Sequence, residues 1–207
     1  MTHLRTLALA SALAFTYSLP SIAIEKSESY VSFETFTGKG DFKLVETYES
    51  EKYSNSANAD PTGASLILGM KSKSKSRYEI QYTYIEISFE DNPDADSGDT
   101  IDIQGLDFNA AFPFADNKVI SPYLLVGFGI YNWQESKDSF SEGVDELTGV
   151  AYNLGLGTSV KLGEPYELDI SYRYKNIDWE TIKDSDGVDA DYSNTMRHIQ
   201  VGARMYF

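Results

Sequence analysis

Histidine is the residue type that most limits the chemistry of this chain. The sequence contains two, His3 and His198, and no cysteine. Acyl transfer would require a nucleophile, a base and an orienting acid within hydrogen-bond reach of one another. Ser193 and Thr195 lie near His198, but no His-x-Ser spacing is present there. We therefore expect no catalytic residue, no cofactor and no metal site, and we expect the His198 side chain to be hydrogen-bonded in a polar environment.

Two acidic segments bear a superficial likeness to calcium-binding loops. They are residues 94–99 (DADSGD) and residues 184–191 (DSDGVDAD). Neither has the glutamate that an EF-hand loop requires at its twelfth position. We interpret both as solvated loops. The alternative is weak binding of divalent cations, either by the loop carboxylates alone or by these together with lipid phosphates.

Charged residues also occur inside segments that alternate between apolar and polar side chains. Oppositely charged groups can share a protein interior when they are paired, and breaking such a pair by removing one partner is costly. The candidates for such interior ion pairs are Asp107, Asp169, Arg173, Lys175 and Arg204.

A separate basic cluster covers residues 71–77 (KSKSKSR). We interpret it as a solvated turn, with contact to anionic lipid headgroups as the alternative.

The elements that position these residues are predicted to be β-strands. Alternation with period two, which marks a strand with two different faces, recurs along the chain. Apparent breaks in the alternation fall at residues 84–85, 105 and 176–177, and a bulge is expected at residues 38–40. The alternating segments cover approximately residues 29–49, 63–71, 77–90, 100–114, 121–135, 147–162, 166–182 and 194–207.

The connections between these segments alternate between long and short. The long, acidic ones are residues 50–62, 91–99, 136–146 and 184–193, and the short ones lie near residues 72–75, 115–119 and 163–165. Short turns on one rim and long polar loops on the other are typical of outer-membrane barrels. The pattern predicts an all-β fold, an eight-stranded antiparallel up-and-down transmembrane β-barrel, with the face rich in Tyr, Phe, Leu and Ile toward lipid and the face with Gly, Ser, Asn and charges toward the lumen.

The N-terminal residues predict export. Residues 7–17 are apolar but too short to span the roughly 30 Å of hydrocarbon in a bilayer, and Ser21-Ile22-Ala23 forms a small-residue cleavage site. We expect residues 1–23 to be a signal peptide and residues 24–207 to be the outer-membrane β-barrel domain. The absence of cysteine argues against a lipid-anchored lipoprotein and a disulfide scaffold.

The net charge restricts the partners. The chain has 17 Lys and Arg residues against 32 Asp and Glu residues, a net charge of −15. Cleavage of the predicted signal peptide would remove Arg5 and no acid, which leaves 16 basic residues against 32 acidic ones and a net charge of −16. This charge argues against binding to nucleic acid or to an anionic membrane surface.

The last ten residues, HIQVGARMYF, alternate strictly and end on an aromatic residue. Together with the segments 122–131 (PYLLVGFGIY), 151–157 (AYNLGLG) and 170–174 (ISYRY), they make the chain resemble the small OmpA/OmpX/OmpW-like outer-membrane β-barrels, a group that includes opacity-type proteins of the porin family of Gram-negative surfaces. The resemblance implies an outer-membrane location, contact with lipopolysaccharide and recognition by the barrel-assembly machinery. The residues expected to form the assembly signal are Val201, Ala203, Met205, Tyr206 and Phe207.

The resemblance specifies architecture more closely than activity. Because the chain ends with the barrel, no peptidoglycan-binding domain is expected. We expect a non-enzymatic protein of the cell envelope with a structural or adhesion-type role, which acts on host or surface ligands through its acidic extracellular loops. The alternatives are a narrow pore for small or apolar solutes, which conductance would reveal, a lipid-modifying outer-membrane enzyme, and a soluble secreted barrel that binds a ligand.

Overall fold

A computed structural model describes residues 27–48, 51–89, 100–115, 119–134, 146–183 and 188–207. The predicted signal peptide, the acidic segment 94–99 and residues 184–187 of the second acidic segment lie outside these ranges, so the signal peptide stays a prediction. No helix in the described part of the chain is long and apolar enough to cross a membrane.

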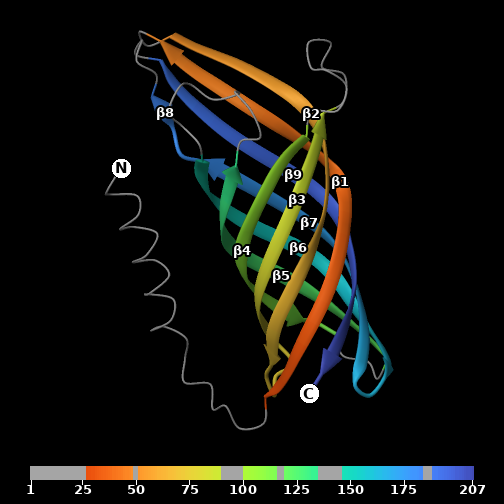
Figure 1. The fold of residues 1–207 in the computed structure, drawn as a ribbon. Coiled ribbons are helices and arrows are strands. Elements are labelled where there is room, and N and C mark those ends of the chain that lie inside the picture. The colour runs from red at the N-terminus through yellow and green to blue at the C-terminus, as the bar shows by residue number, and fades with distance from the viewer. Residues whose placement is uncertain (1–26, 49–50, 90–99, 116–118, 135–145, 184–187) are drawn as a thin grey trace.

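The strands form one closed antiparallel ring (Figure 1). Its order is β1-β2-β3-β4-β5-β6-β7-β9, and pairing of β1 with β9 closes it. The two-residue strand β8 adds to β9 outside the ring. The predicted eight-stranded barrel is therefore confirmed. The strands are β1 (Glu28–Tyr48), β2 (Glu51–Lys71), β3 (Arg77–Phe89), β4 (Thr100–Pro113), β5 (Ile120–Gln134), β6 (Glu146–Gly163), β7 (Tyr166–Trp179), β8 (Ile182–Lys183) and β9 (Asp189–Tyr206).

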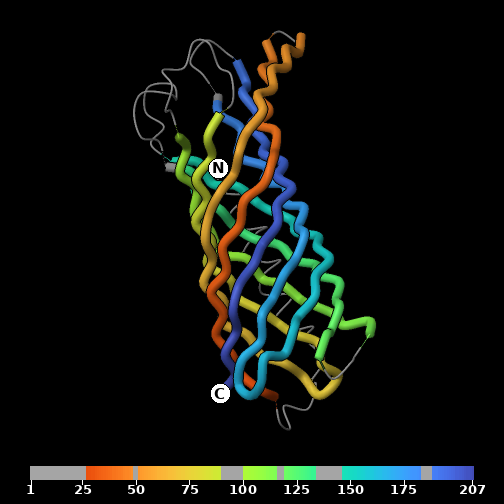
Figure 2. Tube along the Cα trace, turned by 90° about the vertical axis from the view of Figure 1, so that its right-hand side faces the viewer, coloured from red at the N-terminus to blue at the C-terminus, as the bar shows by residue number. Residues whose placement is uncertain are grey.

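The described end of the chain closes the ring at the rim where the short turns lie (Figure 2). The Phe207 N–H donates to the Ser29 carbonyl at 2.9 Å, and the Tyr206 N–H donates to the Pro165 carbonyl at 3.0 Å. The tight turn between β2 and β3 is closed by the Lys75 N–H, which donates to the Ser72 carbonyl at 2.8 Å. In outer-membrane barrels the rim with short turns is periplasmic.

At the opposite rim, two strands are longer than the alternation predicted. β2 begins at Glu51 rather than at Gly63, and β9 begins at Asp189 rather than near Asn194. The expected long loop at residues 50–62 was therefore wrong: most of it is strand. Figures 1 and 2 show β1 and β2 continuing past the ring as a projecting hairpin. Polar composition hid this strand, because both faces of a segment outside the membrane meet water.

The bulge expected at residues 38–40 was also wrong. β1 keeps one register with β2 from Glu28 to Tyr48. The glycine there serves close packing instead, because a Cβ on Gly38 would stand 2.2 Å from the Arg197 carbonyl oxygen.

The predicted breaks in alternation are absent from the backbone. Ile85, Ile103 and Ile177 point into the barrel, in phase with the polar inward residues of the same strands. The side chains change character at these points while the direction of each strand face is unchanged. The apparent breaks in the alternation therefore reflect a change in the environment of the lumen along the barrel axis.

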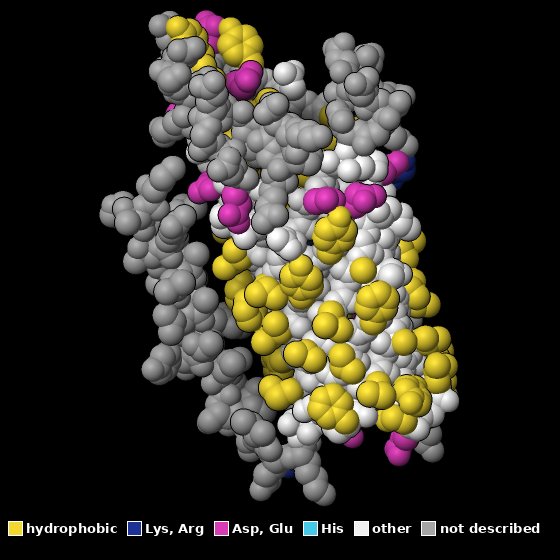
Figure 3. All heavy atoms as spheres, viewed as in Figure 1, with side chains coloured by type: hydrophobic (Ala, Val, Ile, Leu, Met, Phe, Trp, Pro, Cys, Tyr) yellow, Lys and Arg dark blue, Asp and Glu magenta, His cyan; other side chains and the backbone are white. Residues whose placement is uncertain are grey.

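The outer wall carries an apolar belt (Figure 3). Acidic side chains lie above it, toward the end from which the hairpin projects. An apolar band of this kind faces acyl chains in outer-membrane barrels. Large apolar side chains exposed on this wall include Phe33, Leu66, Leu68, Ile80, Leu154, Leu156, Ile170 and Ile199.

We predict that Leu154→Arg destabilises the barrel. Leu154 is 51% exposed on β6 among other belt residues, and an arginine at the middle of the lipid-facing wall lowers the free energy of unfolding by about 2–4 kcal/mol. Urea unfolding in phospholipid vesicles, followed by fluorescence, measures the change. Ser56→Arg in the projecting hairpin is the matched control and should change the unfolding free energy by less than about 0.5 kcal/mol. Equal effects of the two substitutions would contradict the assignment of the belt.

Candidate functional site

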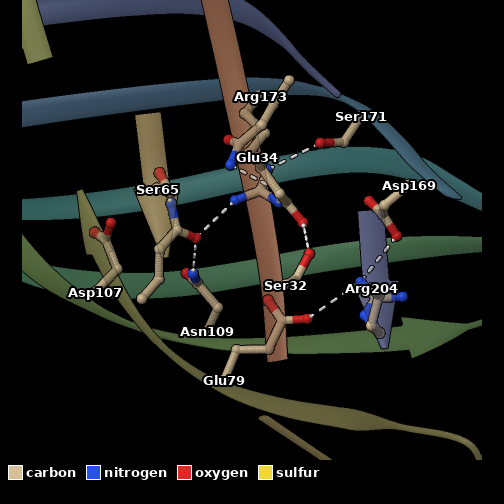
Figure 4. Close-up of polar contacts among 12 residues, drawn as sticks. Ser32, Glu34, Ser65, Glu79, Asp107, Asn109, Asp169, Ser171, Arg173 and Arg204 are labelled. Carbon is tan, nitrogen blue, oxygen red and sulfur yellow. Dashed lines mark hydrogen bonds and ion pairs between the residues drawn. The ribbon is translucent and has the colours of Figure 1, made fainter. Parts of the chain in front are cut away.

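The lumen near the periplasmic rim is organised around Arg204 of β9. One guanidinium nitrogen lies 3.0 Å from Asp169 and another lies 3.2 Å from Glu167. Glu79 is 3.8 Å away. Figure 4 shows Arg204 with Asp169 and Glu79 on either side. The guanidinium also stacks on Tyr30, with 4.7 Å to the ring centroid. Arg204 of β9 thereby links side chains of β1, β3 and β7.

Arg77 of β3 belongs to the same cluster. It is only 6% exposed, lies 3.4 Å from Glu79 and 3.5 Å from Asp169, and donates to Ser159 at 2.5 Å. The expectation that residues 71–77 form a solvated turn was therefore wrong for Arg77. The inward phase of β3 takes this side chain into the lumen, while Lys73 and Lys75 are exposed.

A second layer of polar side chains lies above the first. Arg173 of β7 pairs with Glu34 of β1 at 3.1 Å, and it donates to the amide oxygen of Gln81 at 3.0 Å. Gln200 donates to the same Glu34 carboxylate at 2.6 Å. Figure 4 shows Arg173 and Glu34 side by side at the centre of the lumen.

Lys175 and Asp107 form a third contact, at 2.9 Å. The Asp107 carboxylate also accepts hydrogen bonds from Tyr131 at 2.5 Å and from Asn153 at 2.8 Å. Asp107 is fully buried, so its charge depends on these donors. The structure thus brings the five lumen candidates into paired contacts, but Arg173 pairs with a residue that was not among them.

Three buried carboxylates, Glu34, Glu79 and Glu167, were missed as lumen residues. Each occupies one of the alternating positions that face inward on its strand, so the period-two pattern could have identified it. The clearest case is Glu79, between Tyr78 and Ile80. Including them, the described lumen buries five carboxylates against four cations. Lys71, whose side chain is 17% exposed, adds a fifth cation at the mouth, 3.5 Å from Glu167. The lumen is close to neutral, so the excess negative charge lies elsewhere.

The lumen toward the extracellular rim is apolar, contrary to the expectation of a polar interior throughout. Trp133 and Trp179 lie with ring centroids 5.8 Å apart, and Phe42 lies 5.5 Å from Trp133. These rings join one buried cluster with aliphatic side chains from several strands. The fully buried members of this apolar cluster include Ile85, Ile87, Ile103, Leu147, Ala151, Ile177 and Met196.

His198 lies at the boundary between the polar layers and the apolar cluster. Its ring packs on Phe36 with centroids 4.8 Å apart, and its Nδ1 atom has no hydrogen-bond partner among the described residues. Beside it is a cavity of about 10 Å³, lined also by Arg173 and Lys175, which is the space of a single water molecule. The environment of His198 is therefore polar on one side and apolar on the other, whereas a polar environment was expected.

The described residues contain no group of three or more His, Cys, Asp or Glu side chains placed to hold a metal ion. The described side chains fill the lumen, with ion pairs toward the periplasmic rim and packed aromatic rings toward the extracellular rim. An eight-stranded barrel has an interior just wide enough for side chains to fill, and this one follows that rule.

We predict that Arg204→Met lowers the free energy of unfolding by about 3–5 kcal/mol, because removing one partner leaves uncompensated charges in a buried cluster. Arg197→Met is the matched control, since Arg197 is on the same strand with an exposed side chain. It should change the unfolding free energy by less than about 0.5 kcal/mol. Urea unfolding in vesicles measures both. A loss as small for Arg204→Met as for the control would show that the cluster does not stabilise the barrel.

The comparisons with known proteins agree with this geometry. The sequence profile of the family described as "Outer membrane protein beta-barrel domain" matches residues 6–207. No curated protein matches the chain in sequence.

Several solved structures share the fold at low sequence identity. The outer-membrane protein AlkL, solved in lipid bilayers, is 14% identical with a TM-score of 0.59, and the match covers 87% of this chain and 90% of AlkL. OprG from Pseudomonas aeruginosa is 15% identical with a TM-score of 0.54, covering 88% and 97% of the two chains. Neisserial surface protein A is 18% identical with a TM-score of 0.50, covering 88% and 100%. The chain belongs to the outer-membrane β-barrel protein family, and it is an outer-membrane protein.

Proposed function

We propose that this protein is a non-enzymatic surface-interaction barrel that binds partners through the hairpin projecting from its extracellular rim. The observation that carries the proposal is the edge of β2. β2 pairs with β3 only from Ala59, opposite Phe89, to Lys71. From Glu51 to Asn58, β2 pairs with β1 alone among the described residues. A strand edge of this kind is a template on which another chain can add a strand.

The hydrogen-bonding direction of this edge follows from one contact at the seam. The Phe207 N–H donates to the Ser29 carbonyl, and successive residues of a strand direct their backbone groups to opposite sides. Odd-numbered residues of β1 therefore face β9, and even-numbered ones face β2. The constant β1–β2 register then directs the backbone groups of Lys52, Ser54 and Ser56 away from β1.

The charge around the hairpin defines the partner. The projecting part of the sheet formed by β1, β2 and β9 contains the acids Glu46, Glu51, Asp189 and Asp191 and the two lysines Lys43 and Lys52. The segments 90–99 and 135–145, which connect β3 to β4 and β5 to β6, are acidic in sequence. Complementary potentials favour association, so the partner is an extended segment with basic side chains.

The non-enzymatic part of the proposal rests on His198. Histidine-dependent acid–base catalysis in the described part of the chain would use that residue as the base, and its ring is covered by Phe36 inside a side-chain-filled lumen. A base must reach the proton that it removes from a substrate.

We predict that Ser54→Pro and Ser56→Pro, introduced together, weaken binding at the edge about tenfold. Proline removes a backbone donor and is tolerated on an edge where that donor faces away from the neighbouring strand. Ser54→Ala with Ser56→Ala is the matched control, because it removes the same side chains and keeps both N–H groups. The measurement is adhesion of bacterial cells displaying each protein to immobilised extracellular-matrix proteins. We expect about a tenfold loss of adhesion with proline, equivalent to about 1.4 kcal/mol for the two backbone donors that are removed, and no loss with alanine.

Two results would contradict this function. One is equal adhesion to every surface by cells with and without the protein, and the other is equal adhesion by the proline and alanine variants. Heat-dependent mobility on SDS gels of protein from the membrane fraction verifies that each variant has a folded barrel.

A second candidate function is passage or binding of apolar solutes, and the apolar cluster at the extracellular end of the lumen favours it. Trp133 and Trp179 are the two tryptophans of the chain and both lie in this cluster. Tryptophan fluorescence in vesicles therefore reports directly on solute entry. For a surface-interaction barrel we expect no fluorescence change with decane and no steady conductance in planar bilayers. A saturable fluorescence change, or a steady conductance, would favour the second candidate.

A further inference from the structure

The projecting hairpin has two faces of different chemistry. Even-numbered residues of β1, such as Tyr30 and Phe36, are buried in the lumen. The register of β1 is constant with β2 as far as Tyr48 and with β9 as far as Thr47, so the same alternation continues into the hairpin. Even-numbered residues of β1 and odd-numbered residues of β2 therefore share the face that continues the lumen wall. We call it the inner face of the hairpin.

Two glutamates and two tyrosines alternate at the tip of the inner face. Glu46 lies opposite Tyr53, and Tyr48 lies opposite Glu51. Each tyrosine thus has one carboxylate across the strand pair and another two positions away on its own strand. The Tyr53 hydroxyl donates to Glu51 at 2.8 Å. Both rings are open to a partner, since Tyr48 is 47% exposed and Tyr53 is 56% exposed.

No cation in the described part of the chain neutralises these carboxylates. Neither Glu46 nor Glu51 forms an ion pair among the described residues. The two lysines of the projecting part, Lys43 and Lys52, occupy odd positions of β1 and even positions of β2, so they lie on the opposite, outer face. Carboxylates without a partner, beside exposed aromatic rings, attract a cation from another molecule.

The free edge of β2 determines how a partner would present such a cation. Because Lys52, Ser54 and Ser56 direct their backbone groups to the edge, they would form the hydrogen-bonded pairs with an added antiparallel strand. Glu51 and Tyr53 would then lie in non-hydrogen-bonded pairs, in which opposite side chains come closest. The partner residues opposite Glu51 and Tyr53 are two positions apart and share the inner face. The residue between them faces outward, beside Lys52.

We propose that the inner face of the hairpin tip binds two arginine side chains at alternate positions of the added strand. This inference rests on the proposed function, because it takes the partner to be an extended segment at the edge of β2. The arginine opposite Glu51 would pair with that carboxylate. The arginine opposite Tyr53 would lie over its ring and direct its guanidinium toward Glu46. Arginine suits both positions, because its planar guanidinium pairs with carboxylates and stacks on aromatic faces.

The experiment measures binding of two short fluorescent threonine peptides to the full-length protein in detergent micelles, by anisotropy. Both peptides contain two arginines, which are separated by one threonine in the alternating peptide and adjacent in the other. We expect the alternating peptide to bind about threefold more tightly, because it alone places both arginines on the inner face, where one exposed cross-strand charge pair is worth about that factor. Glu46→Gln with Glu51→Gln should weaken its binding about tenfold and make the two peptides bind alike.

The matched control is Asp41→Asn with Glu86→Gln, which makes the same change of charge at exposed positions away from the inner face. At an ionic strength of about 0.15 M, charges more than about 8 Å apart are largely screened, so this control should leave both affinities unchanged. Heat-dependent mobility on SDS gels establishes that every variant is folded.

Equal affinity of the two peptides, or an equal loss in the two double variants, overturns this inference. If Ser54→Pro with Ser56→Pro nevertheless weakens binding of both peptides, the proposed edge function stands without it. Equal binding of the peptides to the proline variant and to its alanine control contradicts the edge function and this inference together.

Discussion

Closure of the β-sheet is the constraint on which the rest of this structure depends. In a bilayer every backbone N–H and C=O group needs a partner within the protein, and a closed barrel provides one without leaving an edge. With eight strands the enclosed space is just wide enough for side chains. Any charge directed inward therefore meets other side chains rather than bulk water. The pairing of β1 with β9 at the seam thus decides what the interior has to contain.

The interior meets that demand in two different ways along the barrel axis. Toward the periplasm, Arg204 and Arg77 share the carboxylates of Glu79 and Asp169, so each charge has more than one partner. Toward the outside, packed rings and aliphatic side chains replace the ions. Ion pairs fix directions because their geometry is specific, whereas the apolar cluster excludes water without directional bonds. Together they leave little space in the lumen, and this is why we place the proposed function at the extracellular end of the molecule.

The two ends differ in the way that their surroundings require. At the extracellular end, the pairing of β1 with β2 continues past the apolar belt as far as Tyr48 and Glu51. At the periplasmic end, short turns bring cations from β2, β3 and β6 to one mouth, next to apolar side chains at the level of the lipid. The lysines at this mouth lie among the carboxylates of Glu28, Glu164 and Glu167.

The sequence by itself determined the eight strands, the short turns and the lipid-facing wall, because alternation with period two records on which side each residue lies. It could not determine the partner of any lumen charge: Arg173 meets Glu34, 139 positions away, because the barrel closes. It could not separate a slip of phase from a change of environment at Ile85, Ile103 and Ile177, since both place an apolar residue at an inward position. The projecting hairpin was hidden for the related reason that a strand solvated on both faces has no apolar period. Only the tertiary structure, which decides what surrounds each face at each height, settled these points.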